Sequence, residues 1–202
     1  MEKIPQQHSG NCIKIVLFGP ESTGKTTLSK ALAKQYEAAW VPEFAREYLQ
    51  QKWDQEQKIC EPKDILPIAI GQMKLENAAA NSRKKLVFCD TDLLETKVYS
   101  EAYYDGWCDE QVVAAALENE YDLYVLTYID TPWQADDLRD RPEQREEIPR
   151  IWICVHTHVP HHNNSVPCCT SHRPQVPQQL PQHQSPLQHM QDLFLRAPAW
   201  RR

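Results

Sequence analysis

An apolar segment that ends in a glycine-rich turn is the feature that most constrains the fold of this chain. Residues 12–18 (CIKIVLF) are apolar and partly β-branched, as in a strand buried on both faces. Residues 19–26 (GPESTGKT) match the pattern G-x-x-x-x-G-K-[ST] and lead into an amphipathic segment at 25–36. The pattern forms a phosphate-binding loop in this strand–turn–helix context, whereas a chance match in a turn is the alternative.

The chemistry of this loop points to a nucleoside triphosphate with Mg²⁺. Two glycines let backbone N–H groups wrap around phosphate oxygens, and the helix that follows directs the positive end of its dipole at them. Lys25 can reach the β- and γ-phosphates, and the Thr26 hydroxyl can ligate Mg²⁺. With ATP as the ligand, the expected nucleotide-binding residues are Gly19, Glu21, Ser22, Thr23, Gly24, Lys25, Thr26 and Thr27.

Strand-like and helix-like segments alternate along the next hundred or so residues. Strands are expected at 38–41, 85–89 and 123–126, and helices at 43–52, 63–81, 93–104 and 109–120. Alternation of this kind needs crossover connections between neighbouring strands. The sequence therefore predicts an α/β fold of the P-loop NTPase or kinase type, with a parallel sheet flanked by helices.

Charged residues follow the predicted strands at the edge where open parallel sheets bind their ligands. Asp90 is a candidate for the Mg²⁺ shell, and Asp92 for a catalytic base or a substrate anchor. Alternatively, Thr91 or Asp92 caps the next helix. Glu43 and Arg46 are candidates for acceptor binding, with an exposed helix start as the alternative.

An arginine-rich segment follows the last predicted strand. Arg139, Arg141 and Arg145 lie there among acidic residues. Such a segment, closing over the phosphates, would neutralise charge on the γ-phosphoryl group and exclude water. Arg139 and Arg141 therefore join Lys25, Asp90 and Asp92 as expected catalytic residues; a solvated, salt-bridged loop is the alternative.

The composition changes after residue 148. Residues 149–202 hold eight of the 15 prolines and seven of the 8 histidines, which leaves no room for a long amphipathic helix. We divide the chain into an N-terminal extension (1–11), a P-loop kinase domain (12–148) and a Pro/His/Gln-rich tail (149–202). The tail is expected to be disordered or aberrant, through a reading-frame change or a misjoined gene end.

The overall charge and composition argue against several classes of function. A net charge of -6 and a pI near 5.7 are not typical of a nucleic-acid-binding protein. No apolar run is long enough to cross a bilayer, and the N-terminus lacks the apolar core of a signal peptide. We therefore expect a cytoplasmic protein with reduced cysteines, no nucleic-acid or membrane partner, and an undetermined oligomeric state.

Four segments, in this order, resemble a known kinase domain: GPESTGKTTL, VPEFAREYL, FCDTDLLETKVYSEAYY and YDLYVLTYIDTPWQADDLRDRPEQREE. They are similar to the ribosylnicotinamide kinase domain of the bacterial NAD-biosynthesis regulator and its stand-alone AAA-like relatives, over about residues 12–147. The resemblance implies transfer of the ATP γ-phosphate to the 5′-hydroxyl of nicotinamide riboside, giving nicotinamide mononucleotide. It also implies that residues 19–27 bind ATP, that Asp90 and Asp92 lie near metal and sugar, that Glu43 and Arg46 lie near the nucleoside, and that the three arginines form a lid.

The resemblance ends where Pro149 interrupts the segment after residue 147, so we expect the family's last strand and helix to be missing. The residues themselves leave open a kinase for another nucleoside, or an ATP-binding regulatory module without kinase activity. Several aromatic side chains are able either to stack on a nicotinamide ring or to fill the core. They are Trp40, Phe44, Tyr48, Tyr99, Tyr103, Tyr104, Trp107 and Trp133.

Overall fold

The strands and helices expected between residues 12 and 126 are all present. The computed structural model describes residues 2–135 and 138. The element order is β1 (Ile13–Phe18), α1 (Lys25–Gln35), β2 (Ala39–Val41), α2 (Phe44–Glu56), α3 (Pro62–Ala80), β3 (Leu86–Asp90), α4 (Leu93–Tyr103), α5 (Glu110–Glu118) and β4 (Leu123–Leu126). Arg139, Arg141, Arg145 and the tail from residue 149 lie outside the described residues.

The largest difference from the expected boundaries lies at the end of α2, which we placed at residue 52. The helix continues to Glu56, and Gln57 then ends it with a φ of 53°. Lys52 turns inward instead of facing water, and its ammonium lies 2.6 Å from Asp64 and 2.7 Å from Glu61. A lysine in the sequence gives no sign of such burial, so the sequence did not indicate that the helix continues past residue 52.

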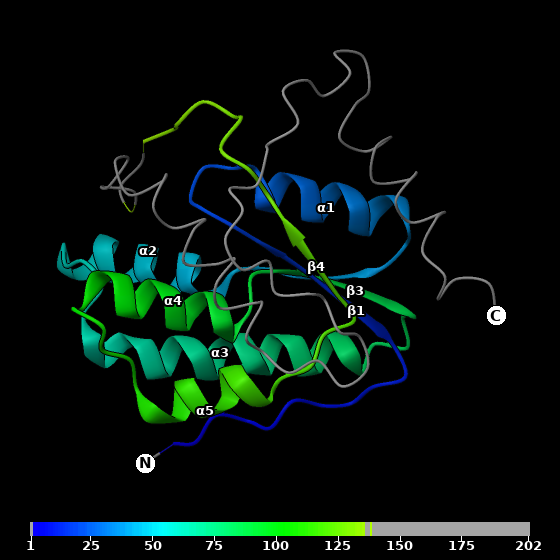
Figure 1. The fold of residues 1–202 in the computed structure, drawn as a ribbon, viewed down its shortest axis with the longest axis horizontal. Helices are drawn as coiled ribbons and strands as arrows, with labels where there is room; N and C mark the ends of the chain where they lie inside the picture. Colours follow the sequence, from blue (N-terminus) through cyan, green and yellow to red (C-terminus); the bar gives the residue numbers. More distant parts are fainter. Residues whose placement is uncertain (1, 136–137, 139–202) are drawn as a thin grey trace, which may run out of the picture. The chain divides into compact units, whose positions relative to one another are not determined.

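The four strands form a single parallel sheet in the order β2-β3-β1-β4 (Figure 1). Leu17 of β1 is in register with Asp90 of β3, Phe18 of β1 with Leu126 of β4, and Val41 of β2 with Cys89 of β3. The carboxyl ends of all four strands therefore meet at one edge. This confirms the predicted α/β architecture and places the glycine-rich turn beside the residues that follow β2, β3 and β4.

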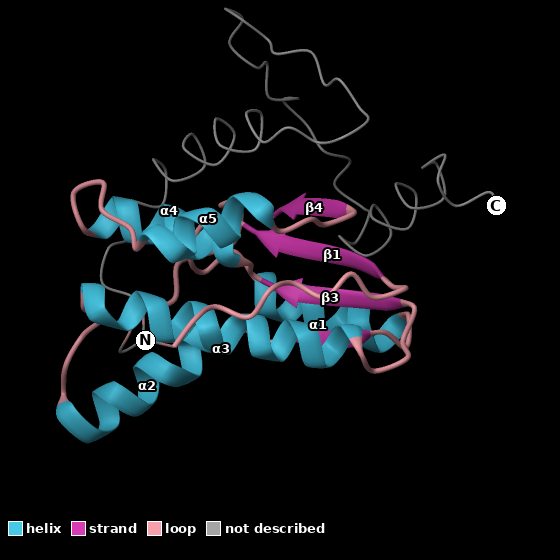
Figure 2. Ribbon diagram, turned by 90° about the horizontal axis from the view of Figure 1, so that it is seen from below, coloured by secondary structure: helices cyan, strands magenta, loops and turns pink. Residues whose placement is uncertain are grey.

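Helices cover both faces of the sheet, with α1 on one face and α3, α4 and α5 on the other (Figures 1 and 2). Successive side chains of a strand point to opposite faces of the sheet, and so pack against the two helix layers in turn. Val16 and Val87 belong to the core formed with α3, α4 and α5. Phe88 points the other way and stacks on Tyr36 at the end of α1, with ring centroids 6.2 Å apart. Burial on both faces explains why β1 and β3 read as continuous apolar runs.

Helix α3 fixes the start of α2 and so the segment that carries Glu43. The backbone N–H of Phe44 donates to Oε1 of Gln72 at 2.8 Å. Next to it, a Cβ added to Gly71 would overlap the Phe44 ring. The absence of a side chain at residue 71 therefore lets α2 approach α3 closely, which positions the residues after β2 at the carboxyl edge of the sheet.

The N-terminal extension is tied to α3. Asn77 receives a hydrogen bond from the backbone N–H of His8 at 2.8 Å and donates one to the carbonyl of Gln6 at 2.9 Å. Gln7 donates to Glu76 at 2.7 Å. These side-chain contacts hold the extension (the blue segment before β1 in Figure 1) against the helix layer.

Strand β4 is less covered than the other strands. Leu123 and Leu126 are exposed, and within the described part of the chain β4 pairs only with β1. The expected loss of the family's last strand and helix concerns residues beyond those described and stays a prediction. No helix among residues 2–135 combines the length and apolar character that a bilayer span requires.

Candidate active site

The turn after β1 has the backbone of an anion-binding loop. Gly19, Ser22 and Gly24 have positive φ angles of 139°, 59° and 83°. Where the backbone alternates between right-handed and left-handed conformations, successive N–H groups point toward one side. A Cβ on Gly19 would lie 2.6 Å from the carbonyl oxygen of Thr127, so only glycine fits there. At Gly24 a Cβ would meet nothing within 4 Å, which leaves that side of the loop open.

Helix α1 begins without an anion of its own. Gly24 provides no side-chain cap, and the first turn holds no acid. The other four described helices each carry an acid in the first turn, at Glu47, Asp64, Glu95 and Glu110. The positive end of α1 is therefore available to an external anion, and Thr26 and Thr27 are exposed beside it.

The Lys25 ammonium is already oriented within the loop. Nζ donates to the carbonyl oxygens of Gly19 at 2.5 Å and Pro20 at 3.1 Å, and it forms an ion pair with Glu95 at 3.1 Å. These contacts match the three donors of an ammonium group. Burial lowers the pKa of Lys25, but Glu95, Glu43 and Asp90 outweigh it, so the pKa is raised and the lysine stays charged.

Glu95 is the site residue that the sequence analysis missed. Its side chain is 4% exposed, and Oε2 accepts a hydrogen bond from the Thr91 hydroxyl at 2.9 Å. Thr91 has a φ of 99°, a strained conformation for a β-branched residue, and its N–H donates to the carbonyl of Leu17 at 3.2 Å. The strained turn thus orients a hydroxyl toward the acid that contacts Lys25.

Glu95 also predicts a pH dependence of stability. Burial raises its pKa from 4.5 to about 8, although Lys25 acts in the opposite direction. Because the folded chain then holds this proton more tightly than the unfolded chain, the free energy of unfolding should fall as pH rises through that window. We expect Glu95→Gln to fall less steeply than wild type in urea unfolding series between pH values of about 5 and 8.

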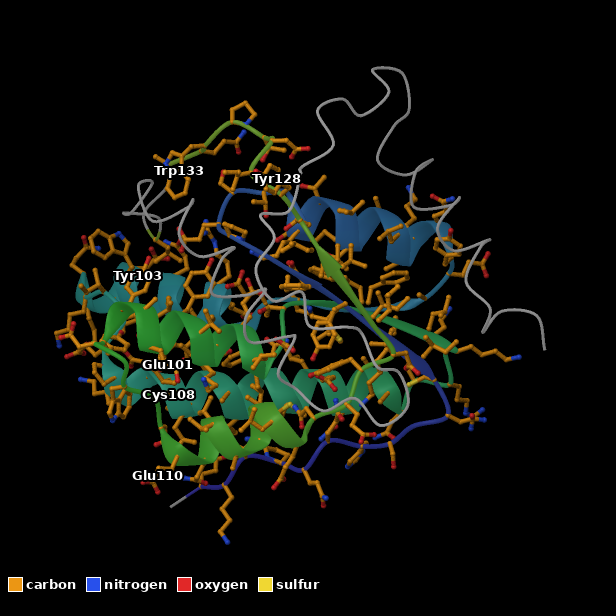
Figure 3. All side chains as sticks on the ribbon, in the orientation of Figure 1. Glu101, Tyr103, Cys108, Glu110, Tyr128 and Trp133 are labelled. Carbon is orange, nitrogen blue, oxygen red and sulfur yellow. The ribbon has the colours of Figure 1, made fainter. Side chains whose placement is uncertain are left out.

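Glu110 provides the matched control, since it is an exposed first-turn acid of α5 (Figure 3). Glu110→Gln should keep the wild-type slope. The variant Glu95→Gln will retain part of the slope, because burial also raises the pKa of Asp92, to about 7. Equal slopes for Glu95→Gln and wild type would contradict the assignment.

Asp90 lies at the end of β3 with a carboxylate suited to a metal shell. The residue is 1% exposed, and Oδ1 has no hydrogen-bond partner among the described residues. Burial raises the pKa of Asp90, while a hydrogen bond from the Thr26 side chain and the charge of Lys25 lower it. An orphaned carboxylate oxygen beside a threonine hydroxyl fits Mg²⁺, which takes one or two protein oxygens together with water and phosphate.

No described group of three or more His, Cys, Asp or Glu side chains is arranged to hold a metal ion. A Mg²⁺ site completed by the phosphates of a nucleotide needs no such group. Thr26 and Asp90 are the residues that would hold the ion, and this assignment stays a prediction.

Asp92 caps α4. Its Oδ1 accepts from the backbone N–H of Glu95 at 2.8 Å, and its Oδ2 accepts from the Tyr124 hydroxyl at 3.1 Å. The capping interpretation is thereby confirmed for Asp92 rather than Thr91. The role of Asp92 as base or anchor stays a prediction, and both of its carboxylate oxygens already have partners.

Glu43 occupies the N-cap position of α2, yet its side chain does not cap the helix. Its charge raises the pKa values of Lys25 and Glu95. Arg46 lies within the first turn of α2. Acceptor binding by Glu43 and Arg46 stays a prediction.

The segment after β4 is anchored to the loop. Thr127, another residue that the sequence analysis did not identify, lies 2.7 Å from the Thr23 hydroxyl. Further on, the Thr131 hydroxyl donates to the carbonyl of Ser22 at 2.7 Å, and the backbone N–H of Gln134 donates to the Ser22 hydroxyl at 2.9 Å. Figure 3 shows Tyr128 and Trp133 on this segment, which leads toward the predicted arginine lid.

Comparisons with known proteins agree with this architecture. The trifunctional NAD biosynthesis/regulator protein NadR of Salmonella typhimurium (strain LT2) is 30% identical over 125 residues, 62% of this chain and 30% of that protein. NadR of Escherichia coli (strain K12) gives the same identity and the same coverage. The chain thus spans about 30% of the length of the curated relatives it matches.

Solved structures of NadR share the fold. The crystal structure of a NadR protein in complex with NR has a TM-score of 0.60 at 24% identity, over 71% of this chain and 42% of that chain. A NadR protein in complex with NAD and AMP-PNP has a TM-score of 0.57 at 23% identity, over 71% of this chain and 40% of that chain.

A family model described as an AAA domain matches residues 14–171. The match begins with β1, includes the whole phosphate loop, and continues past residue 147, where we expected the resemblance to end. With a P-loop between β1 and α1 and a parallel sheet in the order β2-β3-β1-β4, the chain belongs to this AAA domain family.

Proposed function

We propose that this chain is a kinase that transfers the γ-phosphoryl group of ATP to the 5′-hydroxyl of nicotinamide riboside. The product would be nicotinamide mononucleotide. The proposal extends the nucleotide binding expected of a P-loop AAA domain to a reaction and an acceptor. It is supported by the similarity to NadR, a protein of NAD biosynthesis that has been crystallised with NR.

One observation carries the proposal: Lys25 donates to two carbonyl oxygens of the anion-binding loop and also lies 3.1 Å from buried Glu95, with the charges of Glu43 and Asp90 acting on it. A loop that only binds phosphate needs the lysine and the backbone N–H groups. The carboxylates of Glu43 and Glu95 add hydrogen-bond acceptors next to the place where the γ-phosphate would lie. Acceptors of this kind bind the hydroxyl group that attacks a phosphoryl group.

Each group of site residues would have a distinct role in this reaction. The loop backbone and the α1 N-terminus bind the phosphates, and Lys25 neutralises charge that spreads over the γ-phosphoryl oxygens in the transition state. Glu43, whose charge raises the pKa of Lys25, would accept the proton of the attacking hydroxyl. Mg²⁺, when bound through Thr26 and Asp90, would supply positive charge between the β- and γ-phosphates.

Replacing Asp90 by Asn is expected to weaken the Mg²⁺ dependence of nucleotide binding. The amide keeps the size of the side chain but removes the negative charge that attracts the ion, so Mg²⁺ affinity should fall by about 10-fold or more. Titrating Mg²⁺ at a fixed concentration of a fluorescent ATP analogue measures this directly. Affinity for the analogue without Mg²⁺ should not fall, because a buried negative charge has been removed.

Asp109→Asn is the control for this experiment. Asp109 caps α5 through the N–H of Gln111 at 2.9 Å, and asparagine caps a helix equally well. The control should bind Mg²⁺ and nucleotide like wild type. Wild-type Mg²⁺ dependence in Asp90→Asn would exclude Asp90 from the metal shell.

Acceptor-dependent ADP formation by the full chain tests the proposed function. ATP and Mg²⁺ are supplied with nicotinamide riboside, with each common ribonucleoside, with each common deoxynucleoside, or with no acceptor. We expect nicotinamide riboside to raise ADP formation far above the other acceptors. A larger response to another nucleoside would change the acceptor, and ATP binding without any acceptor effect would indicate a regulatory module instead.

A further inference from the structure

We propose that the Tyr99 hydroxyl is a substrate-contacting group that hydrogen-bonds a ribose hydroxyl of the acceptor. The inference rests on the proposed function, because it places the nucleoside next to the γ-phosphate position. It gives a specific polar role to Tyr99 of α4, which the sequence offered only as one of several aromatic residues able to stack on a ring or fill the core.

The first observation is that the Tyr99 hydroxyl is orphaned. Its oxygen is buried and has no hydrogen-bond partner among the described residues. Most buried polar groups in native proteins are hydrogen-bonded, so an exception calls for an explanation. Three other tyrosine hydroxyls of the described chain do have partners, since those of Tyr48, Tyr121 and Tyr124 donate to Asp64, Glu76 and Asp92 at 3.2, 2.7 and 3.1 Å.

The second observation is the position of Tyr99 on α4. It follows Glu95 by four residues, so both side chains lie on the same face of the helix. Glu95 on that face contacts the Lys25 ammonium at 3.1 Å. The face that carries the orphaned hydroxyl is therefore the face that meets the phosphate-binding loop.

Carboxylates from three separate segments act electrostatically on this hydroxyl. Burial is the main reason that the pKa of Tyr99 is raised, followed by Glu95 of α4, Glu21 of the loop and Glu43 after β2. Charges on the phosphate loop, on the segment after β2 and on α4 thus all influence one buried donor. Such convergence is typical of a ligand position rather than of a core packing contact.

The chemistry of the surroundings selects the ligand class. A phenol that donates, with carboxylates that accept, complements a group that both accepts and donates, as the hydroxyls of a ribose do. The charges of Glu21 and Glu43 also repel an anion, which keeps phosphate on the Lys25 side and favours a neutral or cationic nucleoside here. A pyridinium nucleoside such as nicotinamide riboside has both the ribose hydroxyls and the positive charge.

Tyr99→Phe tests the inference because it removes one oxygen atom and little else. We expect nicotinamide riboside, titrated calorimetrically into the full chain with Mg²⁺ and AMP-PNP, to bind about 10-fold more weakly to the variant. AMP-PNP affinity should be unchanged. The urea midpoint should be unchanged or higher, because an unsatisfied buried hydroxyl contributes nothing to stability in the absence of its ligand.

Tyr121→Phe provides a control with the opposite signature. Its hydroxyl donates to Glu76 at 2.7 Å, so the variant should lower the urea midpoint and leave nicotinamide riboside affinity at the wild-type value. Together the two variants separate a ligand-binding hydroxyl from a structural one.

The outcomes distinguish this inference from the proposed function. Equal nicotinamide riboside affinity for wild type and Tyr99→Phe would overturn the inference and leave the proposed function standing. A lower urea midpoint for Tyr99→Phe would overturn it too, since the hydroxyl would then have a partner within the chain. Wild-type protein that binds AMP-PNP but not nicotinamide riboside would refute the proposed acceptor, and with it the contact assigned to Tyr99.

Discussion

Lys25→Ala is expected to lower the rate of phosphoryl transfer by at least about 100-fold, the cost typical of losing one preorganised donor to transition-state charge. In the wild-type chain the ammonium is held by the carbonyls of Gly19 and Pro20 and by Glu95. It therefore needs no reorganisation when charge develops on the γ-phosphoryl oxygens. Acceptor-dependent ADP formation, measured at saturating ATP, gives the size of the effect.

The substitution also removes the ammonium that contacts buried Glu95, so a loss of fold has to be separated from a loss of chemistry. The double variant Lys25→Met/Glu95→Gln removes both charges and should be more stable to urea than Lys25→Ala. It should nevertheless remain as inactive as Lys25→Ala. Near wild-type turnover in either variant would overturn the assignment of the loop.

Glu76→Gln is expected to lower the free energy of unfolding by about 3–5 kcal/mol, the usual cost of leaving one charge of a buried ion pair uncompensated. The Lys14 and Glu76 side chains are 6% and 0% exposed, and Nζ lies 3.2 Å from Oε1. Glu76 also accepts hydrogen bonds from Gln7 at 2.7 Å and from Tyr121 at 2.7 Å. Urea unfolding, analysed as a linear extrapolation, measures the loss.

Glu2→Gln is the matched control, because it removes the acid of an exposed pair that joins the N-terminal extension to Lys74 of the same helix, α3. The side chains of Lys74 and Glu2 are 60% and 67% exposed, and exposed pairs contribute little to stability. The control should unfold at the wild-type urea concentration. If Glu76→Gln did so as well, the buried network would not be what joins the N-terminal extension and β1 to α3.

The fold was predictable because its signals are local. The strand predicted at residues 12–18 is β1, Ile13–Phe18, since an apolar run followed by the two glycines of the loop pattern has few other solutions. The apolar run before Asp90 likewise predicted β3. Because Asp90 lies at the end of that strand, its carboxylate was expected at the edge where parallel sheets bind ligands. The predicted end of α2 at residue 52 was wrong. Lys52 is held inside the helix layer by Asp64 and Glu61 at the start of α3, and no local pattern records these contacts.

The candidate site was only partly predictable, because several of its contacts join distant segments. Glu95 reads in the sequence as a favourable first-turn acid, and only the fold brings it to Lys25. Thr127 supports the loop across 104 residues of sequence, which no local pattern records. Tyr99 stands among several equivalent aromatic residues until the structure shows that its hydroxyl lacks a partner within the described chain.

Detection of nicotinamide mononucleotide is the measurement that tests the central claim most directly. The purified full chain is incubated with ATP, Mg²⁺ and nicotinamide riboside, and the products are separated and weighed by mass spectrometry, with Lys25→Ala run in parallel. We predict nicotinamide mononucleotide and ADP in equal amounts from wild type, and neither above background from the variant. ADP without nicotinamide mononucleotide, or equal product from both proteins, would contradict the account.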